Sequence, residues 1–565
     1  MTKEIEDRVA NWLNGPIDPE TKEEIRSLSE KELNDAFYSS LEFGTGGMRG
    51  IMGPGTNRIN IYTIQMATQG LANYLLKQPP LRDRHYVFIS YDCRNHSKEF
   101  AIQAARVLAA NDIGAYLTHD LRPTPYVSFG VRQKECTAGI MITASHNPKE
   151  YNGYKVYWAD GAQIVSPHDK GIVAEANNIQ DFDQIKLAPE NSPLIQLLDP
   201  EFDLEYLAEL KKLQLDPKED AMAGDHLKIT YTPLHGTGIT LVPRALQEWG
   251  FPNINPVDQQ IVIDGNFSTV PVPNPEYPEA LAMGIKQLQD TQSDILIATD
   301  PDADRMAVTV LHHDKPYILS GNQIAILCLE YICSTLTNQN RLPTNGAAIT
   351  TIVSTDLLPL IAAHYNITCP LVLTGFKYIG ELIHKWEQDN SHSFLFGAEE
   401  SYGYLMGTHS RDKDAVVASC LIAEIALLMK VEGRTLIDYL MDIYKKYGLY
   451  YEGQKVLEFP PGHEGMEKIT QIMDTLRTKH PTEIMGQKVT LAEDYKPGLH
   501  GLPPSNVLLY RLEDGSRLIA RPSGTEPKLK IYGSVKAPLP SNYDNALNTC
   551  TEKLEHLFTA FEKLI

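Results

Sequence analysis

The feature that most constrains the fold of this sequence is a repeated alternation of short apolar runs and amphipathic stretches. Residues 86–92 (YVFISYD) predict a buried strand, residues 97–111 a helix, and residues 114–120 a further strand. A similar order returns within 227–250 and again within 294–404. Strands that alternate with helices in this way indicate an α/β fold with parallel or mixed sheets.

The length and the breaks in this pattern predict several domains. A chain of 565 residues suggests about three to four domains. Polar, proline-rich breaks lie near 190–203, 311–323 and 447–462, and a turn at Asp514–Gly515 and a helix over 543–564 follow the last break. We predict three similar mixed α/β domains and a smaller C-terminal α+β domain, with the boundaries 1–200, 201–316, 317–450 and 451–565.

Charge and cysteine content narrow the class of protein. The net charge of −21 argues against a nucleic-acid partner or an anionic membrane surface, and we expect neither. The seven cysteines show no CxxC spacing, which fits a reducing cytosol, so we expect a cytoplasmic protein. The most apolar stretch, 415–429, contains Glu424 and is too short to span a bilayer, so it predicts a buried helix. The sequence does not predict the oligomeric state.

Three aspartates at alternate positions predict a metal site. Asp300, Asp302 and Asp304 follow the apolar run DILIA, at the end of a buried strand, where α/β proteins place their sites. In extended backbone these positions point to one side, and converging carboxylates need a cation. Oxygen ligands suit Mg²⁺, Ca²⁺ or Mn²⁺ better than zinc. The alternative is a solvated acidic turn.

Ser145 also follows an apolar run, AGIMIT, and precedes His146, Asn147 and Pro148. No G-x-S-x-G elbow is present, and we expect the adjacent side chains of Ser145 and His146 to point apart. A serine that carries a phosphoryl group fits better, because a bound divalent metal would neutralise the phosphoryl charge. The alternative is an ordinary turn, which Asn and Pro favour. Lys155, ten residues later, offers a proton donor or acceptor, or else is a surface lysine.

Other loops suit an anion or a sugar. The loop RPSGTEP can bind a phosphate through the side chains of Arg521, Ser523 and Thr525 and the backbone amide of Gly524. An ordinary hairpin turn fits this sequence as well. The glycine-rich FGTGGMRG carries Arg49 and does not match a P-loop. Glu399 and Ser401 follow an apolar strand and suit sugar hydroxyls, with a solvated acidic loop as the alternative; Lys377 follows another strand end.

Taken together, these motifs resemble the α-D-phosphohexomutase superfamily, the phosphoglucomutase/phosphomannomutase enzymes, over essentially the full chain. TASHNP is similar to the phosphoserine loop of that family, DPDADR to its metal loop, GAEESYG to its sugar-binding loop and RPSGTEP to its phosphate-binding loop. Supporting matches are FGTGGMRG, YDCRNHS, RPTPYVSF, PLHGTG and PNPEYPEAL.

The resemblance implies four domains around a central cleft, each contributing one loop, and it implies roles for the candidate residues. The catalytic group comprises Ser145, Lys155, His146 and Arg49, with Ser145 phosphorylated and Lys155 a candidate general acid or base. One Mg²⁺ is held by Asp300, Asp302, Asp304 and an oxygen on Ser145. The substrate-binding group comprises Arg305, Lys377, Glu399, Ser401, Arg521, Ser523, Gly524 and Thr525.

The activity implied is interconversion of glucose 1-phosphate and glucose 6-phosphate through a phosphoserine, with a sugar 1,6-bisphosphate as intermediate and activator. Tyr402, Gly46 and TGFKYIGE resemble the longer phosphoglucomutase-2/phosphopentomutase branch, which leaves mannose phosphate, pentose phosphate and sugar-bisphosphate synthesis open. Intact Ser145 and the aspartate triplet argue against a silent sugar-phosphate sensor. A Ser145-independent phosphatase is a further alternative. We expect a hinge for the fourth domain within 447–462.

Overall fold

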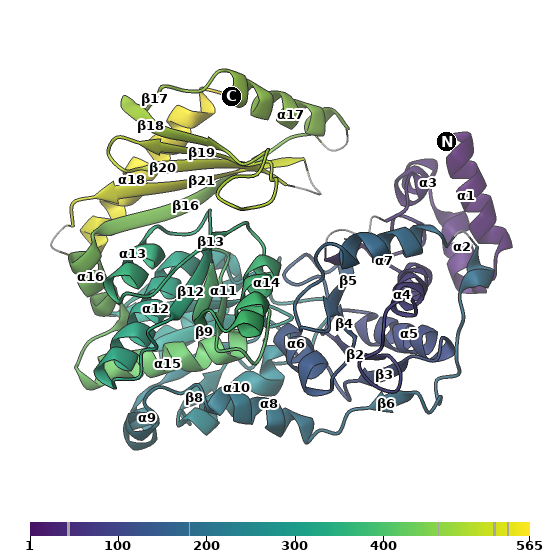
Figure 1. Ribbon diagram of the computed structural model, residues 1–565, viewed down its shortest axis with the longest axis horizontal. Coiled ribbons are helices and arrows are strands. Elements are labelled where there is room, and N and C mark those ends of the chain that lie inside the picture. Colours follow the sequence, from purple (N-terminus) through teal and green to yellow (C-terminus); the bar gives the residue numbers. More distant parts are fainter. Residues whose placement is uncertain (42–45, 180, 461–462, 524–526, 540–541) are drawn as a thin grey trace.

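The computed structural model describes residues 1–41, 46–179, 181–460, 463–523, 527–539 and 542–565. Within these residues the chain forms four sheets flanked by helices, and the first sheet lies to one side of the other three (Figure 1). Helices α1 (Lys3–Asn14), α2 (Pro19–Ser27) and α3 (Glu30–Phe37) precede the first sheet. They close over a small aromatic cluster that contains Trp12, Phe37 and Tyr62.

The first unit is a mixed sheet with the strand order β1-β5-β4-β2-β3-β6. Its strands are β1 (Gly47–Ile51), β2 (Tyr86–Tyr91), β3 (Gly114–Leu117), β4 (Ala138–Ile142), β5 (Tyr151–Trp158) and β6 (Ile195–Leu197), and its helices are α4 (Ile61–Leu75), α5 (Ser97–Ala110), α6 (Thr124–Gln133) and α7 (His168–Asn177). The predicted strand, helix and strand over 86–120 are confirmed as β2, α5 and β3. Strand β4 leads directly to Ser145.

The second unit carries the predicted metal loop in a hairpin. Its sheet has the order β11-β10-β9-β7-β8, and β9 pairs antiparallel with β10, Thr299 lying opposite Met306. The strands are β7 (Ile229–Thr232), β8 (Ile254–Pro256), β9 (Ile295–Thr299), β10 (Met306–His312) and β11 (Lys315–Ile318), with helices α8 (Phe202–Lys211), α9 (Pro217–Ala223), α10 (Gly238–Trp249) and α11 (Pro278–Thr291).

The third unit has the strand order β13-β12-β14-β15. Its strands are β12 (Gly346–Thr351), β13 (Leu371–Val372), β14 (Ser393–Glu399) and β15 (Gly403–Met406), and its helices are α12 (Gly321–Asn338), α13 (Leu357–His364), α14 (Phe376–Asp389), α15 (Ala415–Val431) and α16 (Leu436–Tyr447). The apolar stretch 415–429 is confirmed as part of a buried helix, α15, which packs against α10 of the second unit. In the described part of the chain, no helix is long and apolar enough to cross a membrane.

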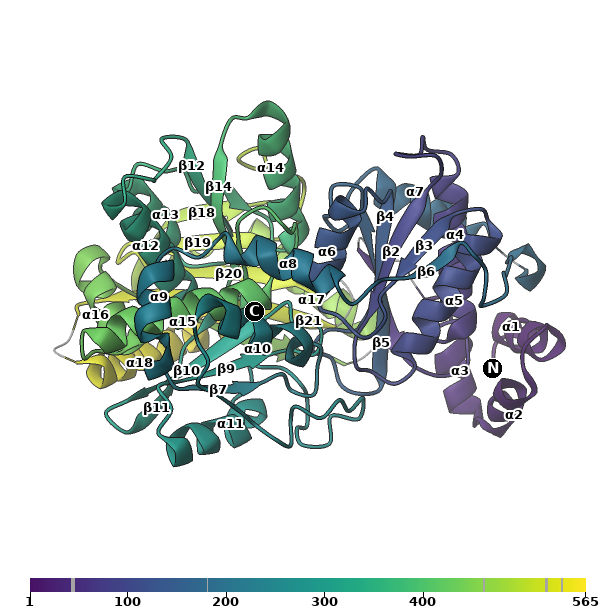
Figure 2. The same ribbon diagram turned by 90° about the horizontal axis from the view of Figure 1, so that it is seen from below.

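The C-terminal unit is a sheet in which neighbouring strands run antiparallel, in the order β16-β21-β20-β19-β18-β17 (Figure 1). Seen from below, its strands β18 to β21 lie behind the second and third units (Figure 2). It comprises β16 (Leu449–Glu458), β17 (Glu483–Ile484), β18 (Gln487–Asp494), β19 (Leu508–Leu512), β20 (Arg517–Pro522) and β21 (Lys528–Ala537), with α17 (His463–Thr478) and α18 (Tyr543–Glu562). The predicted turn at Asp514–Gly515 joins β19 to β20, and the predicted C-terminal helix is α18. Mixed α/β units followed by an α+β unit confirm the predicted fold class.

Candidate active site

Ser145 sits in a strained turn directly after β4. Its side chain is buried, and its φ of 53° lies in the left-handed region that residues other than glycine rarely adopt. The Ser145 N–H donates to Oγ1 of Thr143 at 2.8 Å. Strained backbone of this kind persists only where the surroundings hold it, and it gathers at functional sites.

The Ser145 hydroxyl has two close polar neighbours. It donates to Oδ2 of Asp300 at 3.0 Å, and its Oγ lies 3.1 Å from Nδ1 of His146. The expectation that Ser145 and His146 point apart is therefore wrong, because the left-handed turn at Ser145 brings the imidazole beside the hydroxyl. Burial, followed by the charges of Arg305 and Arg49, holds the pKa of His146 well below its ordinary range, so the imidazole is neutral at neutral pH.

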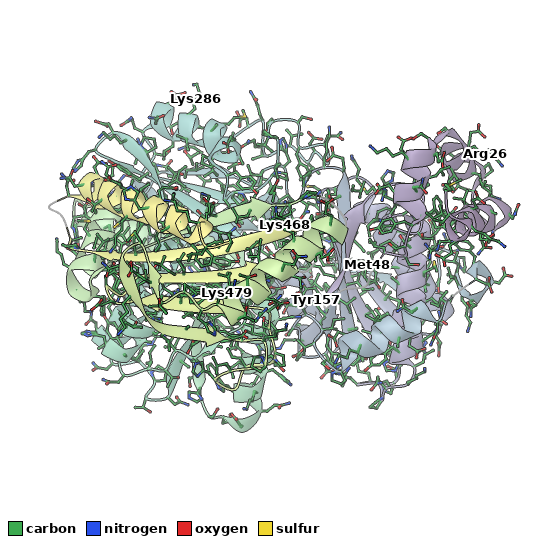
Figure 3. All side chains as sticks on the ribbon, turned by 90° about the horizontal axis from the view of Figure 1, so that it is seen from above. Arg26, Met48, Tyr157, Lys286, Lys468 and Lys479 are labelled. Carbon is green, nitrogen blue, oxygen red and sulfur yellow. The ribbon has the colours of Figure 1, made fainter. Side chains whose placement is uncertain are left out.

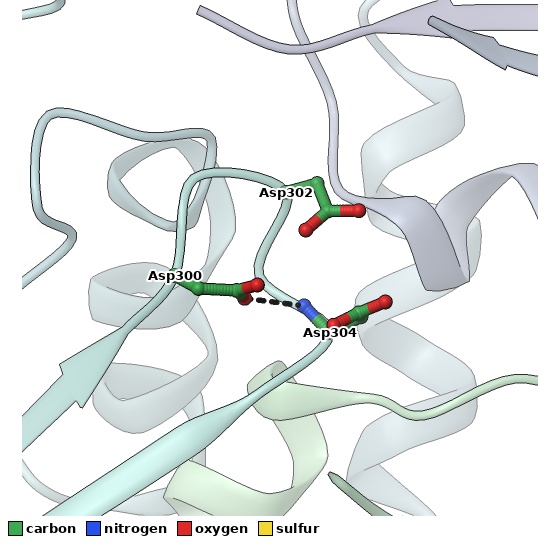
Figure 4. Close-up of side chains that lie close together, drawn as sticks. All are labelled: Asp300, Asp302 and Asp304. Carbon is green, nitrogen blue, oxygen red and sulfur yellow. Dashed lines mark hydrogen bonds between the residues drawn. The ribbon is translucent and has the colours of Figure 1, made fainter. Parts of the chain in front are cut away.

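The three aspartates converge as predicted, but for a different structural reason. Each offers an oxygen, and these oxygens lie within 4.8 Å of one another (Figure 4). The residues do not extend along a strand: they occupy the tight turn between β9 and β10, where Ala303 has a φ of 48°. The Asp304 and Arg305 N–H groups donate to Oδ1 of Asp300 at 3.1 and 3.0 Å, which closes the turn.

The donor set fits a hard divalent cation. Oδ1 of Asp302 and Oδ1 of Asp304 are buried and have no hydrogen-bond partner among the described residues. Burial, together with Asp302 and Asp304, raises the pKa of Asp300 well above its ordinary value, as expected where carboxylates crowd without a cation. Oxygen ligands of this kind suit Mg²⁺.

Lysines from two different units already neutralise part of this charge. Lys155 on β5 lies 2.7 Å from Oδ2 of Asp302 and 3.2 Å from Oδ2 of Asp304, and Lys413 of the third unit lies 3.3 Å from the same Asp304 oxygen. Burial acts to lower the pKa of Lys155, but Asp302 and Asp304 outweigh burial and raise it. Both ammonium groups are therefore cations at neutral pH.

Residues 411–414, which include Lys413, connect the first three units through hydrogen bonds and ion pairs. The Tyr157 hydroxyl of the first unit, at the junction of the first unit with the rest of the chain (Figure 3), donates to Asp412 at 2.8 Å. The Arg411 N–H donates to Oγ of Ser128 at 2.7 Å. Asp414 then caps the first turn of α15. These contacts fix Lys413 beside the aspartates.

Two arginines flank the same region. Arg305 is mostly buried and forms an ion pair with Glu276, and the negative charges of Glu276 and Asp304 outweigh burial to raise its pKa. Arg49 on β1 has an exposed side chain and donates to Oδ1 of Asn147 at 2.9 Å, two residues after Ser145. Arg49 thus contacts the Ser145 loop, and the positive charge of Arg305 acts on the neighbouring His146.

The predicted sugar loop lies between β14 and β15. Buried Glu399 accepts from the Gly375 N–H at 2.8 Å, which ties this loop to the start of α14 and to Lys377. Ser401 is half-buried, and Tyr402 has a φ of 64°. Burial, followed by the charge of Glu399, raises the pKa of Glu400 to about 7. Burial lowers the pKa of Lys377, whose Nζ lies 5.1 Å from the ring centroid of Tyr378.

The predicted phosphate loop follows β20. Arg521 donates to the Tyr532 hydroxyl at 3.4 Å, and the Ser523 N–H donates to the Lys528 carbonyl at 2.8 Å. The charge of Arg521 acts to lower the pKa of Glu400, so Arg521 lies near the sugar loop of the third unit. Gly524 and Thr525, which were also predicted here, lie outside the described residues.

Comparison with known proteins decides the family. Models of the phosphoglucomutase/phosphomannomutase α/β/α domains I, II and III match residues 40–183, 204–313 and 320–447. A phosphoglucomutase of Staphylococcus haemolyticus strain JCSC1435 is 37% identical over 569 residues, which cover 97% of this chain and 99% of that protein. This chain belongs to the phosphoglucomutase/phosphomannomutase family. The resemblance drawn from the motifs is confirmed, and the chain is an enzyme of the mutase type.

Other relatives agree with this assignment. A phosphoglucomutase of Staphylococcus aureus strain USA300 is 37% identical over 551 residues, covering 94% of this chain and 96% of that protein. Among solved structures, a family protein from Burkholderia thailandensis has a TM-score of 0.67 at 16% identity, covering 92% of this chain and 96% of that chain. The open form of parafusin, a Paramecium phosphoglucomutase, has a TM-score of 0.67 at 18% identity, with the same coverage. At these identities the two structures support the fold alone.

Two charged residues at the site were not among the sequence predictions. Lys413 follows the sugar loop in the sequence, in a stretch of mixed charge that is typical of the protein surface. Glu276 lies within PNPEYPEAL, which was noted only as a supporting match. One sequence feature could have identified Lys413 as a site residue: it lies between Asp412 and Asp414, directly before an apolar helix.

Proposed function

We propose that this enzyme interconverts glucose 1-phosphate and glucose 6-phosphate through phosphorylated Ser145. The observation that carries the proposal is the contact of the Ser145 hydroxyl with Asp300, inside a buried group of three aspartates and two lysines. A serine used only as a turn residue has no need of this set of charges. The 37% identity to phosphoglucomutases along nearly the whole chain supports glucose phosphate as the substrate.

The residues have distinct proposed roles. Asp300, Asp302, Asp304 and an oxygen on Ser145 would hold one Mg²⁺. The bound ion would supply positive charge next to the transferred phosphoryl group. Arg49 and Arg305 add fixed positive charge around the same group, which matters because phosphoryl transfer depends mainly on positioning and charge neutralisation.

Proton movements fall to two further groups. Lys155 is protonated in this arrangement, so we assign it the role of proton donor in preference to that of base. In phosphoryl transfer from a sugar bisphosphate, the Ser145 hydroxyl would turn from Asp300 to the neutral imidazole of His146, which lies 3.1 Å away. The Oγ–P bond forms as the sugar O–P bond breaks, the Oγ proton moves to Nδ1, and Lys155 gives a proton to the leaving sugar oxygen. A sugar 1,6-bisphosphate is accordingly the proposed intermediate and activator.

The remaining predicted residues would hold the sugar. Glu399 and Ser401 suit its hydroxyls, and Lys377 adds positive charge at the same edge. Arg521 and Ser523, with Gly524 and Thr525, would grip the phosphate that does not react. We keep the proposed domain boundaries at 1–200, 201–316, 317–450 and 451–565, and a cytoplasmic location is proposed from the sparse, free cysteines.

The fourth domain is proposed to move during turnover, because its loop must grip either end of the sugar. Helix α16 ends at Tyr447 and β16 begins at Leu449, and Gly448 between them has a φ of 99°, a conformation that a side chain would restrict. Solution scattering with and without glucose 1,6-bisphosphate tests this hinge. Identical profiles at saturation would count against it.

The test of function is a coupled mutase assay with 1-phosphates of glucose, mannose and ribose, with and without Mg²⁺ and sugar bisphosphate. We expect glucose 1-phosphate to give the highest kcat/KM, and Ser145→Ala to abolish turnover. Ser192→Ala, in the same predicted domain and away from the site, should behave as wild type. Full activity of Ser145→Ala would overturn the phosphoserine mechanism, and a higher kcat/KM for ribose or mannose phosphate would reassign the substrate.

A further inference from the structure

One arginine outside the predicted site residues holds the loop of Ser145. Arg94 lies in the connection between β2 and α5 and is buried, with 3% of its surface exposed. Its Nη2 donates to the carbonyl oxygens of Ser145, at 2.7 Å, and of Asn147. Its Nη1 donates to the carbonyl oxygens of Pro148 and Tyr151 at 2.8 and 2.9 Å. A single guanidinium group thus donates to four backbone carbonyl groups of the Ser145 loop.

Arg94 belongs to a small polar unit that binds both backbone groups of Ser145. Asp92 lies 3.3 Å from Nε of Arg94, and neither side chain is exposed. Asp92 also accepts from the Thr143 hydroxyl at 2.6 Å, and Thr143 in turn accepts the Ser145 N–H. The left-handed backbone of Ser145 is therefore specified from both sides: its N–H through Thr143 and its carbonyl through Arg94.

The same guanidinium contacts the unit that carries the aspartates. Cζ of Arg94 lies 5.0 Å from the ring centroid of Phe267, a buried residue between β8 and α11. Next to it, the Asn95 amide donates to Oδ1 of Asn266 at 3.0 Å. Arg94 therefore supports the Ser145 loop against the unit whose β9–β10 hairpin holds Asp300.

Arg94 also borders a cavity. The cavity measures about 620 Å³ and is lined by residues that include Tyr91, Arg94, Ile102 and Ile263. Removal of the Arg94 side chain would join the space of the guanidinium group to this cavity, so a small ion could enter from solvent.

We propose that Arg94 is a positioning residue for phosphoryl transfer, which keeps the Ser145 hydroxyl directed at Asp300 without touching the substrate. This role rests on the proposed phosphoserine function. Placement matters because small errors in the position of a reacting group cost large factors in rate. A lysine keeps the positive charge but lacks the planar array of donors that reaches several carbonyl groups at once.

The first test is Arg94→Lys, with Arg106→Lys as a matched control. Arg106 lies on α5 of the same unit, where it donates to the Ala188 carbonyl at 2.9 Å and pairs with Glu190 at 3.8 Å. We expect Arg94→Lys to lower kcat by about 10- to 100-fold with little change in KM. Intact mass after incubation with glucose 1,6-bisphosphate should show a reduced fraction of phosphorylated Ser145. The control should match wild type in both measurements.

Chemical rescue separates positioning from general damage to the fold. Arg94→Ala is assayed with methylguanidinium or with methylammonium, which lacks the planar donors. Recovery of Ser145 phosphorylation with methylguanidinium alone supports the role, and equal recovery with both ions, or with neither, overturns it. Wild-type kcat and phosphorylation in Arg94→Lys also overturn it. If the wild-type protein itself has no mutase activity, the proposed function falls, and this role falls with it.

Discussion

The hydroxyl of Ser145 lies 3.0 Å from a carboxylate oxygen of Asp300, a residue 155 positions away in another unit of the fold. The hydroxyl can donate to that oxygen only while Ser145 is unmodified, because a phosphoryl group at the same place would meet the carboxylate with like charge. Phosphorylation and the proposed Mg²⁺ site are therefore linked: each makes the other more favourable.

This link predicts that the aspartate group destabilises the protein in the absence of metal. Asp300→Asn removes a buried carboxyl group whose ionisation the neighbouring aspartates oppose, and it keeps an oxygen for the N–H groups of Asp304 and Arg305. We expect it to raise the free energy of unfolding without metal by about 1 kcal/mol. Added Mg²⁺ should stabilise the wild type and leave the variant unchanged.

Thermal unfolding with and without MgCl₂ measures both effects. Asp258→Asn, at an exposed position of the same unit, is the control and should respond to Mg²⁺ as the wild type does. Equal Mg²⁺ stabilisation of Asp300→Asn and wild type would show that the ion binds elsewhere.

Lys413 is predicted to contribute charge to catalysis from the third unit. Its ammonium group lies 3.3 Å from Asp304, so Lys413→Met removes a fixed cation beside the transferred group. We expect kcat to fall about 100-fold, the usual scale for loss of one preorganised charge. Lys430→Met removes a lysine of α15 that forms a half-buried pair with Asp294, and steady-state kinetics should show no comparable loss. Similar kcat values for both variants would remove Lys413 from the mechanism.

The main elements of the site were predictable because each is local in sequence. Ser145 and the aspartate triplet both follow an apolar strand directly, and that position alone marks the edge of a sheet where sites form. The orientation of His146 was not predictable, because it depends on a left-handed φ at Ser145 that the surrounding hydrogen bonds impose. The tight turn that brings the aspartates together was not predictable either, because it depends on the left-handed conformation of Ala303.

Contacts between residues far apart in the sequence were the least predictable part of the site. Lys413 and Glu276 look like ordinary charged residues in the sequence, and only the packing of α15 against the second unit and the approach of the β9–β10 hairpin give them partners. Arg94 was missed for a related reason: its four acceptors are backbone carbonyls, and carbonyl groups leave no trace in a residue pattern.

Glu276 is predicted to orient Arg305. The ion pair between these side chains holds a guanidinium group that would otherwise be free to turn in the site. Glu276→Gln should lower kcat/KM by about 10-fold, and Glu276→Asp should recover part of the loss because it restores the charge. Glu279→Gln, three residues later on the exposed first turn of α11, is the matched control in the same kinetic assay. If the loss is the same for the Gln and Asp variants, charge pairing is not the cause.

The last prediction concerns pH and a pair of buried carboxyl groups outside the candidate active site. Asp220 on α9 and Glu424 on α15 are 1% and 2% exposed and hydrogen-bond to each other. Gln214 donates to Asp220, the Leu215 N–H donates to Glu424 at 3.1 Å, and the Tyr331 hydroxyl donates to Glu424 at 2.8 Å. Two carboxyl groups in contact, with neutral donors around them, hold a shared proton at neutral pH.

Burial, followed by the charge of Glu424, raises the pKa of Asp220 to about 9, against about 4 in the unfolded chain. A raised folded-state pKa means that the folded protein binds the extra proton between these values. The stability that the proton provides is complete below about pH 4 and is lost as the pH rises to about 9, at up to about 1.4 kcal/mol per pH unit.

Asp220→Asn keeps a hydrogen-bonding group and cannot ionise. We therefore expect urea unfolding from pH 5 to 10 to show that the free energy of unfolding of the variant rises relative to that of the wild type up to about pH 9. Above this pH the difference between the two proteins should stay constant. A constant difference between the two proteins across this range would mean that Asp220 is ionised in the folded state throughout.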